Sequence, residues 1–187
     1  MDGQVNSSTV NADNPVSFSQ QCQDLKLTFP MMMVMAKRLH LLSSNIMCRA
    51  KNTTQADKVI RVLAKDISLL GTEISLSIDE ARLKLQDLTV LLTKVETINA
   101  TQQGQMVTCL RQLDLVLFPI LTTVKKGEYL AVYSSLEAIH IGAEQPYFDT
   151  VGPQLKIVMT ELKAYYQKQC ALIQDMTERV QNKQCLA

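Results

Sequence analysis

The chain has 187 residues, of which 47% are hydrophobic and 20% charged, and its formal net charge is +1. This length can bury a real hydrophobic core, and the composition argues against intrinsic disorder of the chain as a whole. The near-zero net charge argues against nucleic-acid binding by phosphate neutralisation and against electrostatic attraction to an anionic membrane. Six Gly and five Pro supply few turns, so an all-β fold is disfavoured.

Residues 1–16 are polar, rich in Ser and Asn, and contain no basic residue, so we expect a disordered tail followed by one helical domain over residues 17–187. The start of the chain resembles neither a secretory signal nor a myristoylation site, and Cys185 is third from the end, where prenylation needs a fourth-from-end cysteine. The longest charge-free apolar runs have about ten residues, roughly half of a membrane span. We therefore expect no transmembrane segment and a cytoplasmic location.

The first helix is predicted to begin at Ser17, which forms a capping-box pattern with Gln20. Apolar positions then recur at alternating steps of four and three, the heptad spacing of a seam that faces another helix. Pro30 lies inside this pattern without disturbing its phase, so a kink is expected there and not a helix end. The seam consists of Phe18, Cys22, Leu25, Phe29, Met32, Ala36, Leu39, Ser43 and Ile46.

A second helix is predicted over residues 55–99, after a connection at residues 51–54, with a possible bend at Gly71. A second apolar line accompanies its main seam, which predicts a wide face that touches more than one neighbour. The main seam consists of Leu63, Ile67, Leu70, Ile74, Ile78, Ala81, Leu85, Leu88, Leu92 and Val95, and the second line of Val62, Leu69, Leu76, Leu83 and Val90.

After a polar turn at residues 101–104, a third helix with a Pro119 kink is predicted to end at Lys125, Lys126 and the capping glycine Gly127. A short helix over residues 128–141, a loop over residues 143–152 and a last helix opened by Pro153 should follow. The expected seams are Met106, Leu110, Leu113, Leu117, Ile120 and Val124 in the third helix, and Leu155, Val158, Leu162, Tyr165, Gln169, Leu172, Met176 and Val180 in the last.

These elements predict an all-α fold, a bundle of four long amphipathic helices plus one short helix. The short connections favour an antiparallel up-down arrangement.

The motif closest to a chemical site is Glu137-x-x-His140, which is half of a di-iron carboxylate signature. The other histidine, His40, is preceded at the matching position by Lys37 and so supplies no second half. Zinc, P-loop, dinucleotide and serine-hydrolase motifs are absent from the sequence. We therefore expect that the chain is not an enzyme. It should have no catalytic, cofactor-binding or metal-binding residues and should bind no cofactor.

Two features have both a structural and a functional interpretation. The cluster Met31, Met32, Met33 and Met35 points around the whole helix, so it predicts either core beside Pro30 or a pliable binding surface, with core favoured. Gln169 on the last seam either sets helix register or faces solvent at the end of the bundle.

Five cysteines and three N-glycosylation sequons bear on location. The widely spaced Cys22, Cys48, Cys109, Cys170 and Cys185 are consistent with free thiols in a reducing compartment, or with two disulfides and one thiol in a secreted protein. Sequons at Asn6, Asn52 and Asn99 favour the second view.

The leading hypothesis is a non-enzymatic adaptor or scaffold that binds a protein partner, or itself, through helical seams. A secreted four-helix ligand of cytokine type and an amphipathic lipid-binding bundle are the alternatives. No nucleic-acid partner is expected.

Overall fold

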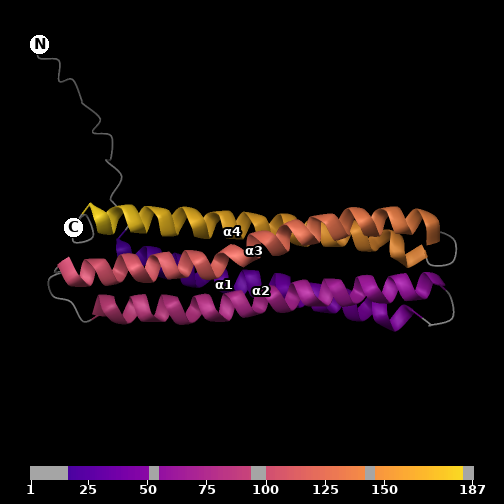
Figure 1. The fold of residues 1–187 in the computed structure, drawn as a ribbon, viewed down its shortest axis with the longest axis horizontal. Helices are drawn as coiled ribbons and strands as arrows, with labels where there is room; N and C mark the ends of the chain where they lie inside the picture. Colours follow the sequence, from indigo (N-terminus) through magenta and orange to yellow (C-terminus); the bar gives the residue numbers. More distant parts are fainter. Residues whose placement is uncertain (1–16, 51–54, 94–99, 142–145, 183–187) are drawn as a thin grey trace, which may run out of the picture.

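The computed structural model describes residues 17–50, 55–93, 100–141 and 146–182. Four long helices carry nearly all of these residues: α1 (Phe18–Arg49), α2 (Gln55–Thr93), α3 (Ala100–Ile141) and α4 (Val151–Gln181). A short 3-10 helix, η2 (Pro146–Thr150), precedes α4. No strand occurs among the described residues, which confirms the predicted all-α bundle (Figure 1). The expected tail at residues 1–16 lies outside them.

The helices form a ring in which each one packs against the next along the chain, and α4 closes the ring against α1. Neighbours run antiparallel, as the contacts between α1 and α2 demonstrate. Ser43 Oγ donates to Ala64 O at 2.7 Å, and 3.3 Å separate His40 Nδ1 from Ser68 Oγ, so the numbers rise in α1 as they fall in α2. Short connections make this the simplest arrangement.

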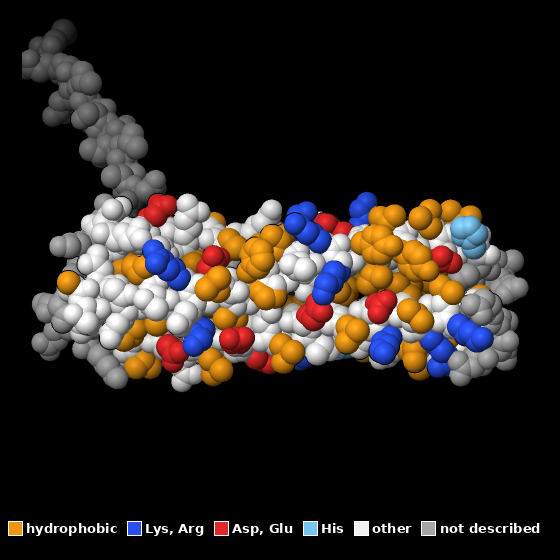
Figure 2. All heavy atoms as spheres, viewed as in Figure 1, with side chains coloured by type: hydrophobic (Ala, Val, Ile, Leu, Met, Phe, Trp, Pro, Cys, Tyr) orange, Lys and Arg blue, Asp and Glu red, His pale blue; other side chains and the backbone are white. Residues whose placement is uncertain are grey.

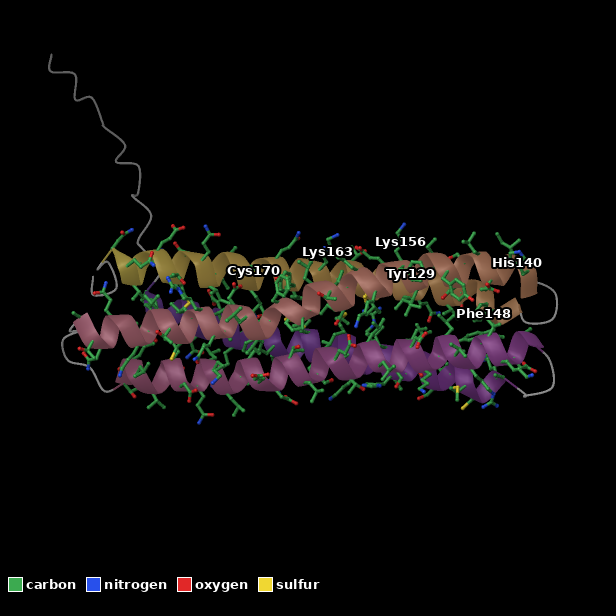
Figure 3. The ribbon with its side chains drawn as sticks, in the orientation of Figure 1. Tyr129, His140, Phe148, Lys156, Lys163 and Cys170 are labelled. Carbon is green, nitrogen blue, oxygen red and sulfur yellow. The ribbon has the colours of Figure 1, made fainter. Side chains whose placement is uncertain are left out.

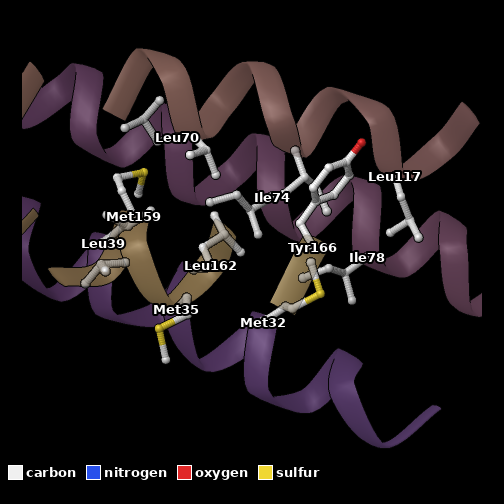
Figure 4. Packing of buried hydrophobic residues seen from close by; sticks show 14 of the residues in the cluster. Met32, Met35, Leu39, Leu70, Ile74, Ile78, Leu117, Met159, Leu162 and Tyr166 are labelled. Carbon is white, nitrogen blue, oxygen red and sulfur yellow. The ribbon is translucent and has the colours of Figure 1, made fainter. Parts of the chain in front are cut away.

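One continuous apolar core runs along the centre of the bundle (Figure 4). It contains all six seam positions predicted for α3 and eight of the nine predicted for α1, where the ninth, Ser43, is buried but polar. In α2 the main seam is buried from Leu63 to Leu88. In α4 six of the eight predicted seam positions are buried. At the other two, Tyr166 and Ile173 are buried in place of the predicted Tyr165 and Leu172, which are only half-buried.

The ends of α1 follow from local hydrogen bonding. Ser17 Oγ accepts a hydrogen bond from the Gln20 backbone N–H at 3.2 Å, which confirms the predicted cap. The helix continues through Pro30 to Arg49, as its unbroken seam predicted. The Ala50 carbonyl then accepts a hydrogen bond from the Arg61 guanidinium at 2.7 Å, so a side chain of α2 caps the end of α1.

The predicted break at Gly127 was wrong, because α3 is one helix from Ala100 to Ile141. Gly127 is buried, and a Cβ atom there would lie 2.7 Å from Met159 Cγ of α4. The glycine therefore permits a close approach of two helices and does not cap one. The expected short helix at residues 128–141 is the last third of α3, and the expected turn at residues 101–104 is its first turn.

The second apolar line of α2 was also predicted wrongly. All five of its residues are exposed, and none of them packs into the core. The helix does touch both α1 and α3, as predicted, but it does so through its main seam and through polar side chains such as Ser68 and Glu73. Gly71 lies within α2, where a Cβ atom would be 2.9 Å from Ala36 O of α1.

Three polar interactions link α4 to α1. These two helices share fewer contacts than the other neighbouring pairs. Arg38 Nη1 lies 2.7 Å from Glu161 Oε2, and Gln21 donates to the Asp175 carboxylate. Gln169 is fully buried, and its Nε2 donates to Leu25 O at 3.1 Å. The interpretation of Gln169 as a solvent-facing gap was therefore wrong.

Candidate functional site

The most distinctive surface of the bundle is a second heptad seam on the outside of α3. It comprises Leu115, Phe118, Thr122, Lys125, Tyr129, Val132, Leu136 and Ile139, which follow one another at alternating steps of three and four. We call these eight residues the outward seam. All eight side chains are exposed, and the six large apolar ones are each more than half exposed, up to 77% at Ile139.

This seam exists because α3 is apolar on two sides. Its buried seam, from Met106 to Val124, faces the core. The outward seam lies on the opposite side of the same helix, and its last four residues span more than two turns without a charge on the seam itself. Figure 2 shows hydrophobic side chains gathered over the C-terminal half of α3, near His140. Contiguous exposed apolar patches of this kind usually mark interaction sites.

Aromatic packing shapes the middle of the outward seam. The rings of Tyr129 and Tyr133 stack with centroids 6.4 Å apart and planes 13° from parallel. Beside Tyr129, a groove of about 510 Å³ opens between α2 and α3, and Leu69 and Leu130 contribute to its walls. Figure 3 shows Tyr129 on this open face, with Lys156 and Lys163 projecting from neighbouring α4. The seam therefore borders a hollow that a protruding side chain of another molecule could fill.

Charges line both edges of the outward seam in pairs. On the α2 side, Lys126 Nζ lies 2.9 Å from Glu73 Oε1, and Thr123 Oγ1 donates to Glu73 Oε2 at 2.9 Å. On the α4 side, Lys163 Nζ lies 3.1 Å from Glu128 Oε1. These pairs neutralise the edges, whereas Lys125, on the seam itself, makes no ion pair within the described residues.

The residues of the possible metal motif do not come together with further ligands. His140 is exposed, and its Nδ1 lies 3.0 Å from the Leu136 carbonyl oxygen of its own helix. Glu137 shares a hydrogen bond with the Tyr133 hydroxyl. Desolvation, which is the larger cause, and this hydrogen bond both raise the pKa of Tyr133. No group of three or more His, Cys, Asp or Glu side chains suited to a metal occurs in the described part of the chain.

Four thiols can be placed in the structure, and all of them are unpaired. Cys22 is buried, and desolvation raises the pKa of its thiol to about 11. Burial likewise raises the pKa of Cys109 and Cys170, whereas Cys48 is exposed. The described residues thus contain no disulfide. Cys185 and the sequons at Asn6, Asn52 and Asn99 lie outside them.

The Met cluster divides between core and surface. Met32 and Met35 are buried, and Met33 packs against the core with its sulfur 3.5 Å from Ser75 Oγ of α2. Only Met31 and the neighbouring Val34 are exposed among residues 31–35. The interpretation as core therefore holds for most of the cluster.

By length and composition, α3 could also cross a membrane. Between Ala100 and His140 it contains an 18-residue window with a mean hydropathy of 1.5 and no more than two charged residues, and a third of that window is buried in the bundle. Counting only charge-free runs in the sequence overlooked this window. Core helices of soluble proteins can have the same character.

Comparison with known proteins identifies no relative. No protein-family model matches the chain, and no curated protein or solved structure is detectably similar to it.

Reasoning from the sequence missed the outward seam, although the signal was present. The predicted helix end at Gly127 divides the seam into two halves, and neither half is long enough to establish a heptad pattern. Extending the count of three and four from Leu115 to Ile139 would have revealed it.

Proposed function

We propose that this chain is a non-enzymatic helical-bundle protein that acts by binding a helical partner through the outward seam of α3. The single observation that carries the proposal is the unbroken heptad spacing of eight exposed residues, from Leu115 to Ile139. A helix that packs into such a seam inserts its side chains between these residues, and this geometry requires the 3.5-residue repeat.

The groove beside Tyr129 adds a place for an anchoring side chain. Leu69 and Leu130 offer it apolar walls, while Asp66 and Glu73 on α2 and Lys125 and Lys126 on α3 surround it. An apolar pocket with a polar rim is the usual arrangement of an interaction hot spot. The free thiols of Cys22, Cys48, Cys109 and Cys170 fit a reducing compartment, which supports a cytoplasmic location.

Photo-crosslinking tests this proposal directly. A photoreactive amino acid placed at Val132 or Ile139 of the full chain, in the cells that make it, should give covalent adducts with a protein. Adducts should disappear when Leu136→Glu is added. The same probe at Leu27 or Leu41, which are comparably exposed on α1, should give none. Equal yields at all four positions, or adducts with lipid alone, would contradict the proposal.

A lipid surface is the second candidate ligand for the same face. It is favoured by the basic side chains near the apolar patch, Lys125 on α3 and Lys156 on α4, and by the high hydropathy of α3. Interfacial helices often combine a basic edge with an apolar face. Flotation of the chain with vesicles of phosphatidylcholine and phosphatidylserine, abolished by Ile139→Glu, would favour this candidate over a helical partner.

A further inference from the structure

We infer that the occupant of the outward seam is a second copy of this chain, paired antiparallel about a twofold axis level with Gly127. This inference rests on the proposed function, because it names the helical partner. It follows from three features of the seam: its register, the residues at its centre and its area.

The register of the outward seam is the same when read in either direction. Its steps are three, four, three, four, three, four and three, so reversing the helix about residue 127 places every seam residue level with another seam residue. Symmetric dimers need such self-complementarity, because one patch must serve both subunits. The paired levels are Leu115 with Ile139, Phe118 with Leu136, Thr122 with Val132 and Lys125 with Tyr129, each residue from a different copy.

The outer layers of this arrangement match apolar side chains with apolar side chains. Leu115 and Ile139 are the two most exposed apolar residues of the seam, at 70% and 77%, and they would cover each other at both ends of the interface. Leu136 would cover Phe118 one layer further in. Parallel pairing in register would instead place Lys125 against Lys125 at the centre of the interface.

The central layers pair the one charged residue of the seam with its one tyrosine. Lys125 has no ion-pair partner within the described residues, and Tyr129 is largely exposed. The negative face of an aromatic ring attracts an ammonium group, and the lysine stem covers apolar surface as well. Twofold symmetry makes this contact twice. The bundle itself uses the same chemistry where Arg49 lies over the Tyr147 ring at 3.8 Å.

The area of the seam suits a dimer interface. From Leu115 to Ile139 the helix rises over about 36 Å, at about 1.5 Å per residue. The exposed parts of its six large apolar side chains amount to on the order of 700 Å² per copy, close to the roughly 800 Å² per partner of a stable interface. A lipid surface would need no such register.

Disulfide trapping tests the inference with the full chain. Leu115→Cys and Ile139→Cys are made separately, each with Cys48→Ser to remove the exposed native thiol, and are mixed under mild oxidation. Mass spectrometry of the digested, unreduced mixture should find a disulfide between positions 115 and 139 of different copies. Leu115→Cys mixed with Leu41→Cys, on the α1 face, is the matched control and should give no such bond.

Each outcome has one meaning. A 115–139 disulfide in large excess over the control supports the antiparallel dimer. Disulfides joining 115 to 115 and 139 to 139 overturn it in favour of parallel pairing, and yields equal to the control overturn self-association. In the last case, a photo-adduct from Val132 to a different protein would leave the proposed function intact, whereas the absence of any protein adduct would remove both. Circular dichroism of each variant verifies that the bundle is folded.

Discussion

Individual glycines set the distances between helices in this bundle. Gly152, near the start of α4, lies so close to α3 that a Cβ atom would be 2.7 Å from the Ala131 carbonyl oxygen. Backbone atoms cannot move aside as a side-chain end can, so the helices themselves would have to separate. Gly104, in the first turns of α3, has nothing within 4 Å of the same added atom. Helix packing therefore requires a glycine at position 152 but not at position 104.

Substitution by alanine should separate these roles. Gly152→Ala should lower the free energy of unfolding by about 1–3 kcal/mol, the range for overpacking. Gly104→Ala should raise it by up to about 1 kcal/mol, because alanine has the better helix propensity and no clash. Urea denaturation followed by circular dichroism measures both. An unchanged stability for Gly152→Ala would mean that α3 and α4 do not approach as described.

Gln169 is the buried polar residue whose role is least obvious. Its Nε2 donates to Leu25 O, but its Oε1 has no hydrogen-bond partner in the structure. Leu25 O also accepts from Thr28 Oγ1 at 2.9 Å, so it would keep a donor if Gln169 were lost. The glutamine therefore carries a desolvation cost of its own without being indispensable to its acceptor.

Replacing Gln169 by an apolar side chain of the same length should not harm stability. We expect Gln169→Met to leave the free energy of unfolding unchanged or to raise it by about 1 kcal/mol, whereas Gln169→Ala should lower it by creating a cavity. Thermal and urea unfolding of the two variants give the comparison. A loss of more than about 1 kcal/mol for Gln169→Met would show that the bond to Leu25 dominates.

At the scale of the element, α2 contains buried apolar residues on its seam and exposed apolar residues off the seam. Ile78 is fully buried, whereas Leu76, two residues earlier, is 66% exposed. We therefore expect Ile78→Ala to lower the free energy of unfolding by about 2–5 kcal/mol and Leu76→Ala to change it by less than about 0.5 kcal/mol. Equal losses of stability would indicate that Leu76 is buried as well, as a wide apolar face of α2 would require.

Heptad counting predicted the buried faces of the helices well and their ends less well. The seam of α1 continued unbroken through Pro30, and so did the helix. Gly127 misled the prediction because a glycine after two lysines has the same local pattern whether it caps a helix or lets a neighbour approach. Only the contact with Met159, which comes from a distant part of the chain, distinguishes the two. The shift from Tyr165 to Tyr166 in α4 likewise depends on how that helix is rotated against its neighbours.

At the scale of the whole molecule, the sequence could not say which apolar seams face inward. The buried and outward seams of α3 have the same spacing and similar residues, and only the assembled bundle distinguishes them. A ring of four helices uses one seam from each helix. The second line of α2 and the outward seam of α3 are both left over. Of these two, only the outward seam has apolar residues at both of the alternating positions.

The proposed function therefore depends on one surface, and the bundle acts as its rigid support. Substitutions on the outward seam should leave the fold intact, because these side chains are exposed, and should change only association. This separation between stability and binding makes the hypothesis open to a direct test.

The most direct measurement is analytical ultracentrifugation of the full chain across the micromolar range, compared with two variants. The wild-type chain and Leu27→Glu, altered on α1, should sediment as dimers, and Val132→Glu, altered on the outward seam, should sediment as a folded monomer. A wild-type chain that remains monomeric throughout, or a Val132→Glu variant that still dimerises, would contradict the central claim.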